Sequence, residues 1–120
     1  MLERVSVLIV DDDPVHLKIY GWIIEAAGYR AVPVQVQFKG VQLSEDRVDL
    51  VLLGLHFAGL TTAIETAKLI KARYPHAPIV VLSEAVTLPD DIAPLVQGFV
   101  RKGDPAKLVD SLHQLLASTP

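Results

Sequence analysis

Polar side chains follow several apolar runs of this sequence, each at the point where a run ends. They are two acids, a hydroxyl and an amine, namely Asp11, Asp12, Ser83 and Lys102. Carboxylates can hold a hard cation such as Mg²⁺ through their oxygen atoms. A hydroxyl and an ammonium group can contact the oxygens of a phosphoryl group. These residue types indicate three parts of a pocket that could accept a phosphoryl group.

The fourth part of such a pocket, a carboxylate nucleophile, is missing from the sequence. A further apolar run, at residues 49–53, ends at Gly54, where that carboxylate should stand. Glycine has no side chain and therefore no oxygen that could attack phosphorus. The sequence predicts no catalytic residue at this position and none of the standard chemistry of a phosphoryl-accepting pocket.

The bulk composition limits the kinds of protein that this chain can be. Its 120 residues are 51% hydrophobic, which is enough for one domain with a packed core, expected over residues 1–120. The net charge of −3, without a long run of either sign, argues against direct nucleic-acid binding and a polybasic membrane anchor. No apolar stretch approaches the roughly 18 residues of a spanning helix.

The residue types that the chain lacks also carry information. Zero cysteines exclude disulfides, thiolate catalysis and Cys-based zinc sites, and a reducing compartment fits this composition. The four histidines show no close metal-ligand spacing, so surface roles are expected for them. The first residues lead directly into a strand and lack the layout of a signal peptide. We therefore expect a cytoplasmic protein.

Apolar runs alternate with segments of helical period along the whole chain. The runs are apolar on both faces, which is typical of strands in a parallel sheet that is covered on both sides. Five strands are expected at residues 4–10, 30–36, 49–53, 79–82 and 98–101. Helices are expected from residue 14, at 37–46, at 63–74, within 83–97 and from residue 104. The second helix is weak because of Gly40, and Pro89 and Pro94 make the fourth short or broken.

The first helix has clear start and stop signals. Asp13 is placed to cap its N-terminus, with Pro14 at the first helical position and Gly28 beyond its end. Apolar residues at helical spacing predict one buried stripe, with Trp22 in the core. The stripe consists of Val15, Ile19, Trp22, Ile23 and Ala26.

Strands and helices in this alternation predict an α/β fold. Right-handed crossovers would join the five strands into a parallel sheet inside a three-layer, doubly wound sandwich. In such sheets the functional groups gather at the carboxyl ends of the strands. All residues of the expected pocket occupy such ends, so we expect them to lie close together.

Four segments carry a resemblance to a known family. They read Val-Leu-Ile-Val-Asp-Asp-Asp-Pro at 7–14, Asp-Leu-Val-Leu-Leu at 49–53, Val-Val-Leu-Ser at 80–83 and Gly-Phe-Val-Arg-Lys at 98–102. In this order and spacing, which cover nearly the whole chain, they resemble the receiver domain of bacterial response regulators. The resemblance implies the flavodoxin-like strand order 2-1-3-4-5.

In that family a histidine kinase donates a phosphoryl group to an aspartate at the end of the third strand. An acidic pair and that aspartate hold Mg²⁺. By resemblance, Asp11 and Asp12 match the acidic pair, and Gly54 matches the acceptor. The hydroxyl residue, the lysine and the switch aromatic of the family fall on Ser83, Lys102 and Phe99.

The sequence departs from the family pattern around the acceptor. The family usually reads Met-Pro-Gly after the acceptor, where this chain has Phe57, Ala58 and Gly59. A small residue normally follows the hydroxyl residue, but here Glu84 is bulky and negative where a dianion would approach. Several changes in one pocket favour a natural pseudo-receiver over a single engineered substitution.

Two expectations follow for the remaining charged groups. Asp11 and Asp12 keep an acidic pocket, but with one ligand missing they predict weak Mg²⁺ binding at most and no tightly held cofactor. Lys102 is expected to pair with Asp11 or Asp12, because opposite charges in a shared pocket attract. Such a pair would hold the site permanently.

We therefore expect a phosphorylation-independent, receiver-like signalling module of a two-component or phosphorelay system, and not an enzyme. Its partners are expected to be proteins or an output domain, and a homodimer is one form of such contact. Two alternatives stay open: an engineered inactive variant of a phosphorylatable receiver, and a small ligand-binding domain on a flavodoxin-like fold. The acids after the first strand weigh against the second alternative, because they repel a flavin phosphate.

Overall fold

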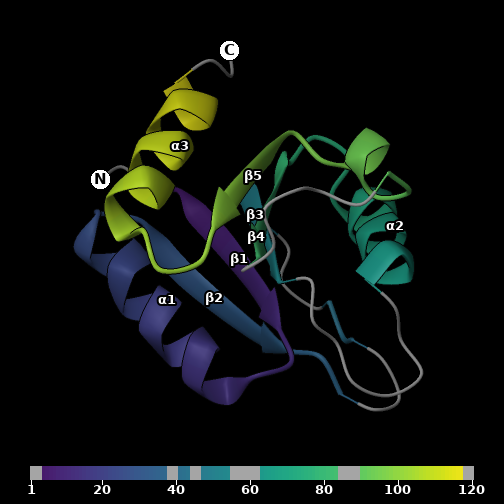
Figure 1. Ribbon diagram of the computed structural model, residues 1–120, viewed down its shortest axis with the longest axis horizontal. Coiled ribbons are helices and arrows are strands. Elements are labelled where there is room, and N and C mark those ends of the chain that lie inside the picture. The colour runs from purple at the N-terminus through teal and green to yellow at the C-terminus, as the bar shows by residue number, and fades with distance from the viewer. Residues whose placement is uncertain (1–3, 38–40, 44–46, 55–62, 84–89, 118–120) are drawn as a thin grey trace.

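Five parallel strands form one sheet in the order β2-β1-β3-β4-β5 (Figure 1). The strands are β1 (Ser6–Asp11), β2 (Arg30–Gln35), β3 (Leu50–Gly54), β4 (Ile79–Ser83) and β5 (Gly98–Arg101). The structure is a computed structural model, and it describes residues 4–37, 41–43, 47–54, 63–83 and 90–117. The strand order confirms the α/β fold and the topology expected from the sequence.

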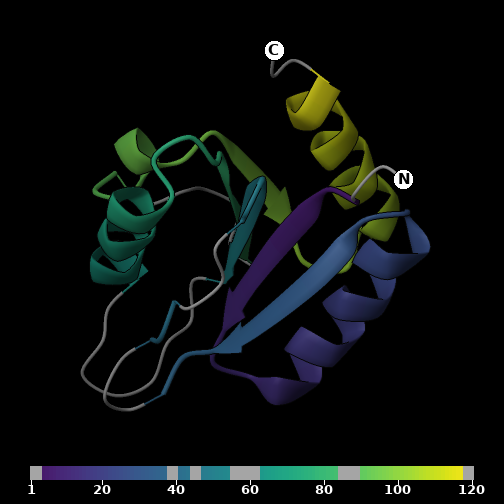
Figure 2. The same ribbon diagram turned by 180° about the vertical axis from the view of Figure 1, so that it is seen from behind.

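Helices cover both faces of this sheet and make the molecule three-layered. Helices α1 (Pro14–Ala26) and α3 (Pro105–Ala117) lie on one face, and α2 (Ala63–Arg73) lies on the other (Figures 1 and 2). A single 3₁₀ turn, η1 (Ala93–Leu95), accompanies α2 on its face. In the described part of residues 83–97, this turn is all that remains of the expected fourth helix, in agreement with its two prolines.

The central strands are buried along their whole length. Every residue of β1, β3 and β4 is buried, as expected for strands that are covered on both faces. Along β1, Val7 and Ile9 point into the core beneath α1 and α3, whereas Leu8 and Val10 point into the core beneath α2. This alternation fixes which side chains of the neighbouring strands can face each layer.

Helix α1 begins where the sequence predicts. The side chain of Asp13 accepts a hydrogen bond from the N–H of Val15 at 2.9 Å, and Pro14 takes the first helical position. The helix ends before Gly28, whose φ of +96° is a left-handed conformation that glycine adopts without strain. The two ends of α1 are thus set by local signals that the sequence displays.

The buried face of α1 differs from the prediction. Leu17, Tyr20 and Ile24 point into the core, whereas Trp22 is 64% exposed and Val15 is 60% exposed. Apolar residues occur on more than one side of this helix, so their periodicity alone does not select a face. The core position of Trp22 was therefore a wrong prediction. Packing against the sheet decides the rotation of the helix.

Two further expectations concern the stretch around β2. Pro33 lies within β2, which is tolerated because β2 is an edge strand with one unpaired side. No helix forms in the described residues of the expected segment 37–46: Gln37 makes an isolated bridge, and residues 41–43 have no regular structure. The low helix propensity of the glycine in this segment agrees with that result.

Candidate functional site

The carboxyl edge of the sheet brings three of the expected site residues into contact. Asp11 ends β1, Gly54 ends β3, and Lys102 directly follows β5. The Nζ atom of Lys102 lies 3.3 Å from Oδ2 of Asp11. Although 91 residues separate them in sequence, the parallel sheet places both at the same edge.

The carboxylate of Asp11 is buried and engaged on both oxygen atoms. Its side chain is only 5% exposed, and that of Lys102 is 8% exposed. Oδ2 faces the ammonium group, while Oδ1 accepts a hydrogen bond from the N–H of Asp13 at 3.0 Å. The ion pair expected for Lys102 is therefore present with Asp11, in a place where solvent screens it little.

Gly54 lies directly beneath this carboxylate. A Cβ atom at position 54 would lie 2.7 Å from Oδ2 of Asp11 and 3.0 Å from its Cγ. Real side chains do not approach so closely, so the present position of Asp11 is compatible only with glycine at 54. Any side chain at position 54 would have to enter space that the carboxylate of Asp11 fills.

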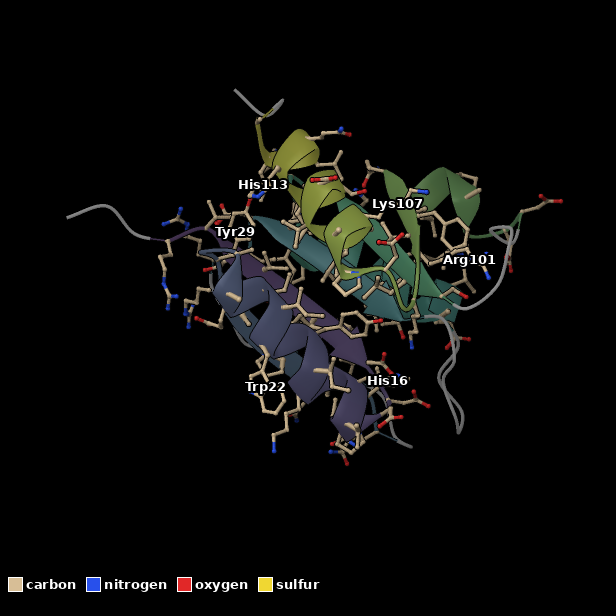
Figure 3. The ribbon with its side chains drawn as sticks, turned by 60° about the vertical axis from the view of Figure 1, so that its left-hand side comes forward. His16, Trp22, Tyr29, Arg101, Lys107 and His113 are labelled. Atoms are coloured by element: carbon tan, nitrogen blue, oxygen red, sulfur yellow. The ribbon has the colours of Figure 1, made fainter. Side chains whose placement is uncertain are left out.

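A histidine that the sequence analysis had assigned to the surface belongs to this cluster. His16 lies near the start of α1 (Figure 3), and its Nδ1 atom is 3.0 Å from Nζ of Lys102. Because an ammonium group has only donors, the lysine donates here and an unprotonated Nδ1 accepts. The other ring nitrogen, Nε2, lies 3.7 Å from Oδ2 of Asp13. The three-residue spacing of Asp13 and His16 on a helix that starts at the pocket was the signal that could have indicated this contact.

These donors do not fit a tightly held magnesium ion. Mg²⁺ requires oxygen ligands in a near-octahedral arrangement, whereas an ammonium group here occupies the Asp11 oxygen that would face the metal. Position 54 supplies no carboxylate. In the part of the chain that the structure describes, no three histidine, cysteine, aspartate or glutamate side chains are grouped so that they could share a metal ion. Asp12 is half-buried, and its backbone carbonyl accepts a hydrogen bond from the side-chain Nε2 of Gln35 at 3.3 Å.

The other expected pocket residues are placed around this cluster. Ser83 is fully buried at the end of β4, and its carbonyl oxygen accepts the N–H of Lys102 at 2.9 Å. Phe99 is partly buried on β5 and lines a pocket of about 470 Å³ whose other lining residues include Lys102 and Lys107. The expected pocket-altering residues, Phe57, Ala58 and Glu84, lie outside the described residues.

The helices of the described residues were compared with the length and apolar character of a membrane-spanning helix. None of them has the length and apolar character needed to cross a bilayer.

Comparison with known proteins identifies the family and the fold of the chain. The family model described as "Response regulator receiver domain" matches residues 7–113. The chain is similar to the transcriptional regulatory protein GlrR of Escherichia coli, with 32% identity over 92 residues, or 76% of this chain and 20% of that protein. It is also similar to the transcriptional regulatory protein ZraR of Klebsiella oxytoca, with 29% identity over 122 residues, or 98% of this chain and 27% of that protein. The chain thus spans between a fifth and about a quarter of these relatives.

A solved structure shows the same fold. The crystal structure of a CheY-like response regulator receiver domain protein from Methanospirillum hungatei superimposes with a TM-score of 0.79. The match covers 96% of this chain and 95% of that one, at 16% sequence identity. At so low an identity, the likeness concerns the path of the backbone and leaves the chemistry of the pocket to the residues themselves.

Proposed function

Because the chain belongs to the response regulator receiver domain family, we propose that it is a pseudo-receiver, a signalling module that acts through protein–protein contacts without phosphorylation. The observation that carries this proposal is the position of Asp11. Its carboxylate fills the space above Gly54 and pairs with Lys102, so the pocket contains its own anion. A receiver that depends on phosphorylation needs that space for the acceptor and that lysine for the phosphoryl group.

The charge arrangement supports a single, permanent state of the pocket. Lys102 is buried against Asp11 and also donates to His16, so its ammonium group is already neutralised and oriented. A partner that switches this module must then prefer one of two conformations through its own contacts. The signal would enter through the partner or through the amount of the protein.

The partner in this proposal is a protein or an output domain. GlrR and ZraR are transcriptional regulatory proteins several times longer than the matched segment. By analogy, residues 1–120 form a single receiver-like domain that acts on another domain or chain. A homodimer is one arrangement in which this contact could occur.

Intact-mass measurement after treatment with acetyl phosphate and Mg²⁺ tests the proposal. The natural chain and Gly54→Asp are compared, with a receiver domain that carries the acceptor aspartate as positive control. We expect no added phosphoryl group on the natural chain and poor recovery in Gly54→Asp, because Glu84 remains. A stable adduct on the natural chain, mapped to a carboxylate of this pocket, would refute the proposal.

A further inference from the structure

The side of α1 that faces away from the sheet carries a row of exposed apolar side chains. Val15 is 60% exposed, Ile19 is 42% exposed and Trp22 is 64% exposed, and Trp22 points away from the sheet (Figure 3). Their spacing of four and three residues places them in one line along the helix, and the exposed Ala26 continues this line. We call these four residues the outer face of α1. An exposed apolar cluster of this kind is typical of a surface that contacts another molecule.

The opposite side of the same helix holds the outer face in place. Leu17, Tyr20 and Ile24 are buried in the core that α1 shares with the sheet and with α3. Because these side chains occupy the core, α1 cannot rotate its outer face inward without unpacking. The exposure of the outer face is therefore a property of the folded chain.

Trp22 is suited to be the central contact of an interface. Its ring lies beside a neighbour on the same helix, with the ammonium group of Lys18 at 5.3 Å from the ring centroid. A tryptophan side chain offers a large apolar surface, and the residues that dominate the affinity of protein interfaces are enriched in tryptophan. The contact with Lys18 restricts the ring before any partner binds.

Two charges of opposite sign lie on one flank of the outer face. Lys18 and Glu25 are seven residues apart, which is about two helical turns, so both project to the same side of the apolar line. Glu25 is 43% exposed, and it accepts hydrogen bonds from Arg4 and from the N–H of Ala31. A carboxylate has about four acceptor sites, so Glu25 can accept another donor at the surface.

The outer face is complementary to itself when two copies of α1 pack antiparallel. A two-fold axis perpendicular to the helix, near residues 20–22, brings Lys18 of one copy beside Glu25 of the second copy. The same operation sets Ile19 against Trp22 of the second copy. Because a two-fold interface uses the same surface on both copies, each of these contacts occurs twice.

We propose that the outer face of α1 is a dimer interface, and that its partner is a second copy of this chain packed antiparallel about a two-fold axis. Burial of the apolar side chains supplies the affinity, and the charges of Lys18 and Glu25 select the direction of packing. A helix of 13 residues from each copy, about 20 Å long, makes an interface smaller than the roughly 1,600 Å² of stable complexes. The dimer is therefore weak and depends on protein concentration.

This inference rests on the proposed function in one respect, that the module acts through protein contacts. It names the surface and the partner of such a contact, and it does not use the pocket at Gly54. The test below measures association, whereas the intact-mass test measures phosphorylation. The two proposals can therefore fail separately.

Sedimentation equilibrium of the full chain, from micromolar to millimolar concentration, tests the dimer. We expect a reversible equilibrium between monomer and dimer. Trp22 is the only tryptophan, so its emission should shift to shorter wavelength as the dimer forms and the ring leaves water. A chain that stays monomeric at millimolar concentration would overturn the proposal and leave the outer face to a different protein. A dimer that forms without the shift in emission would show that another surface is used.

Substitution of exposed apolar residues locates the interface. Trp22→Ala should raise the Kd of the dimer at least about tenfold, because a central tryptophan contributes a large share of the affinity. Leu69→Ala is the matched control: Leu69 is 51% exposed on α2, which covers the other face of the sheet, and its substitution should leave the Kd unchanged. An unchanged Kd in Trp22→Ala, or an equal increase in both variants, would contradict the assignment.

An exchange of charges tests the antiparallel direction. Lys18→Glu and Glu25→Lys each place like charges beside one another twice in their own homodimers, so each should raise the Kd about threefold to tenfold. In an equimolar mixture of the two variants, the heterodimer restores both pairs of opposite charge and should form with the Kd of the natural chain. A mixture no tighter than the separate variants would contradict the arrangement. Lys18 is exposed, so Lys18→Glu can be measured even if Glu25→Lys fails to fold, and an unchanged Kd in Lys18→Glu would likewise contradict it.

Discussion

The carboxylate of Asp11 stands where the side chain of residue 54 would begin, since a Cβ atom on Gly54 would lie 2.7 Å from its Oδ2. This relationship links the glycine at position 54 to the ion pair between Asp11 and Lys102. The absence of a side chain at 54 leaves room for the carboxylate of Asp11, which pairs with Lys102. An acid inserted at 54 would consequently meet an occupied space as well as a second negative charge.

Gly54→Ala should destabilise the protein by about 1–3 kcal/mol, because the new methyl group must displace a buried carboxylate. Gly54 is not among the described glycines with positive φ, so the cost arises from the contact and not from the backbone. Urea unfolding measures the change. Gly21→Ala is the matched control: no atom lies within 4 Å of its Cβ position, and alanine in helix α1 should raise stability by up to about 1 kcal/mol. Equal stability of Gly54→Ala and the natural chain would contradict the crowding.

Lys102→Ala should lower the free energy of unfolding by about 3–5 kcal/mol, because it leaves the buried Asp11 carboxylate without its counter-ion. The same substitution at the exposed Lys68 should change it by no more than about 0.5 kcal/mol. Chemical denaturation of the two variants compares them directly. Adding Asp11→Asn to Lys102→Ala should recover part of the loss. If Lys102→Ala is as stable as the Lys68 variant, the ion pair between Lys102 and Asp11 does not stabilise the site.

Trp22→Ala should lower the free energy of unfolding by at most about 1 kcal/mol, because the ring is largely exposed. Its described contact is with the ammonium group of Lys18, which lies 5.3 Å from the ring centroid. Ile24→Ala, two residues along the same helix, should cost about 2–5 kcal/mol because Ile24 is fully buried. Trp22 is the only tryptophan in the chain, so its fluorescence reports the position of this ring. Emission at the wavelength of a water-exposed indole is expected. A blue-shifted spectrum in the monomer would show that the ring is covered.

The free energy of unfolding at acidic pH should depend on Glu25. A hydrogen bond from the N–H of Ala31 at 2.8 Å, followed by the contact with Arg4, holds the pKa of this carboxyl below its ordinary value of 4.5. A lowered folded pKa contributes stability that is complete above pH 4.5 and is lost as the pH falls through the folded value. Below pH 4.5 the natural chain should therefore lose stability more steeply than Glu25→Gln.

Unfolding at a series of pH values between 6 and 2 measures this difference. Asp110→Asn, which removes an exposed acid from α3, serves as the charge-matched control. If the free energy of unfolding falls equally with pH in the natural chain and in Glu25→Gln, Glu25 does not contribute to the loss of stability in acid.

Local signals in the sequence determined much of the fold. Strands β1, β3 and β4 are buried on both faces, so continuous apolar runs revealed them. Asp13 and Pro14 start α1 through contacts between neighbours in sequence, which a sequence displays directly. Because parallel strands place their carboxyl ends at one edge, the gathering of Asp11, Gly54 and Lys102 was also predictable.

Only the tertiary structure decided which side chains face one another. The rotation of α1 depends on packing against the sheet, so it turned Trp22 outward and brought His16 to Lys102. The sequence does not reveal that the carboxylate of Asp11 fills the space above Gly54. That position depends on the rotamer of Asp11 and on an ion pair between residues 91 positions apart. Sequence spacing fixes contacts within a helix or strand, whereas contacts between elements follow from the angles and distances at which they pack.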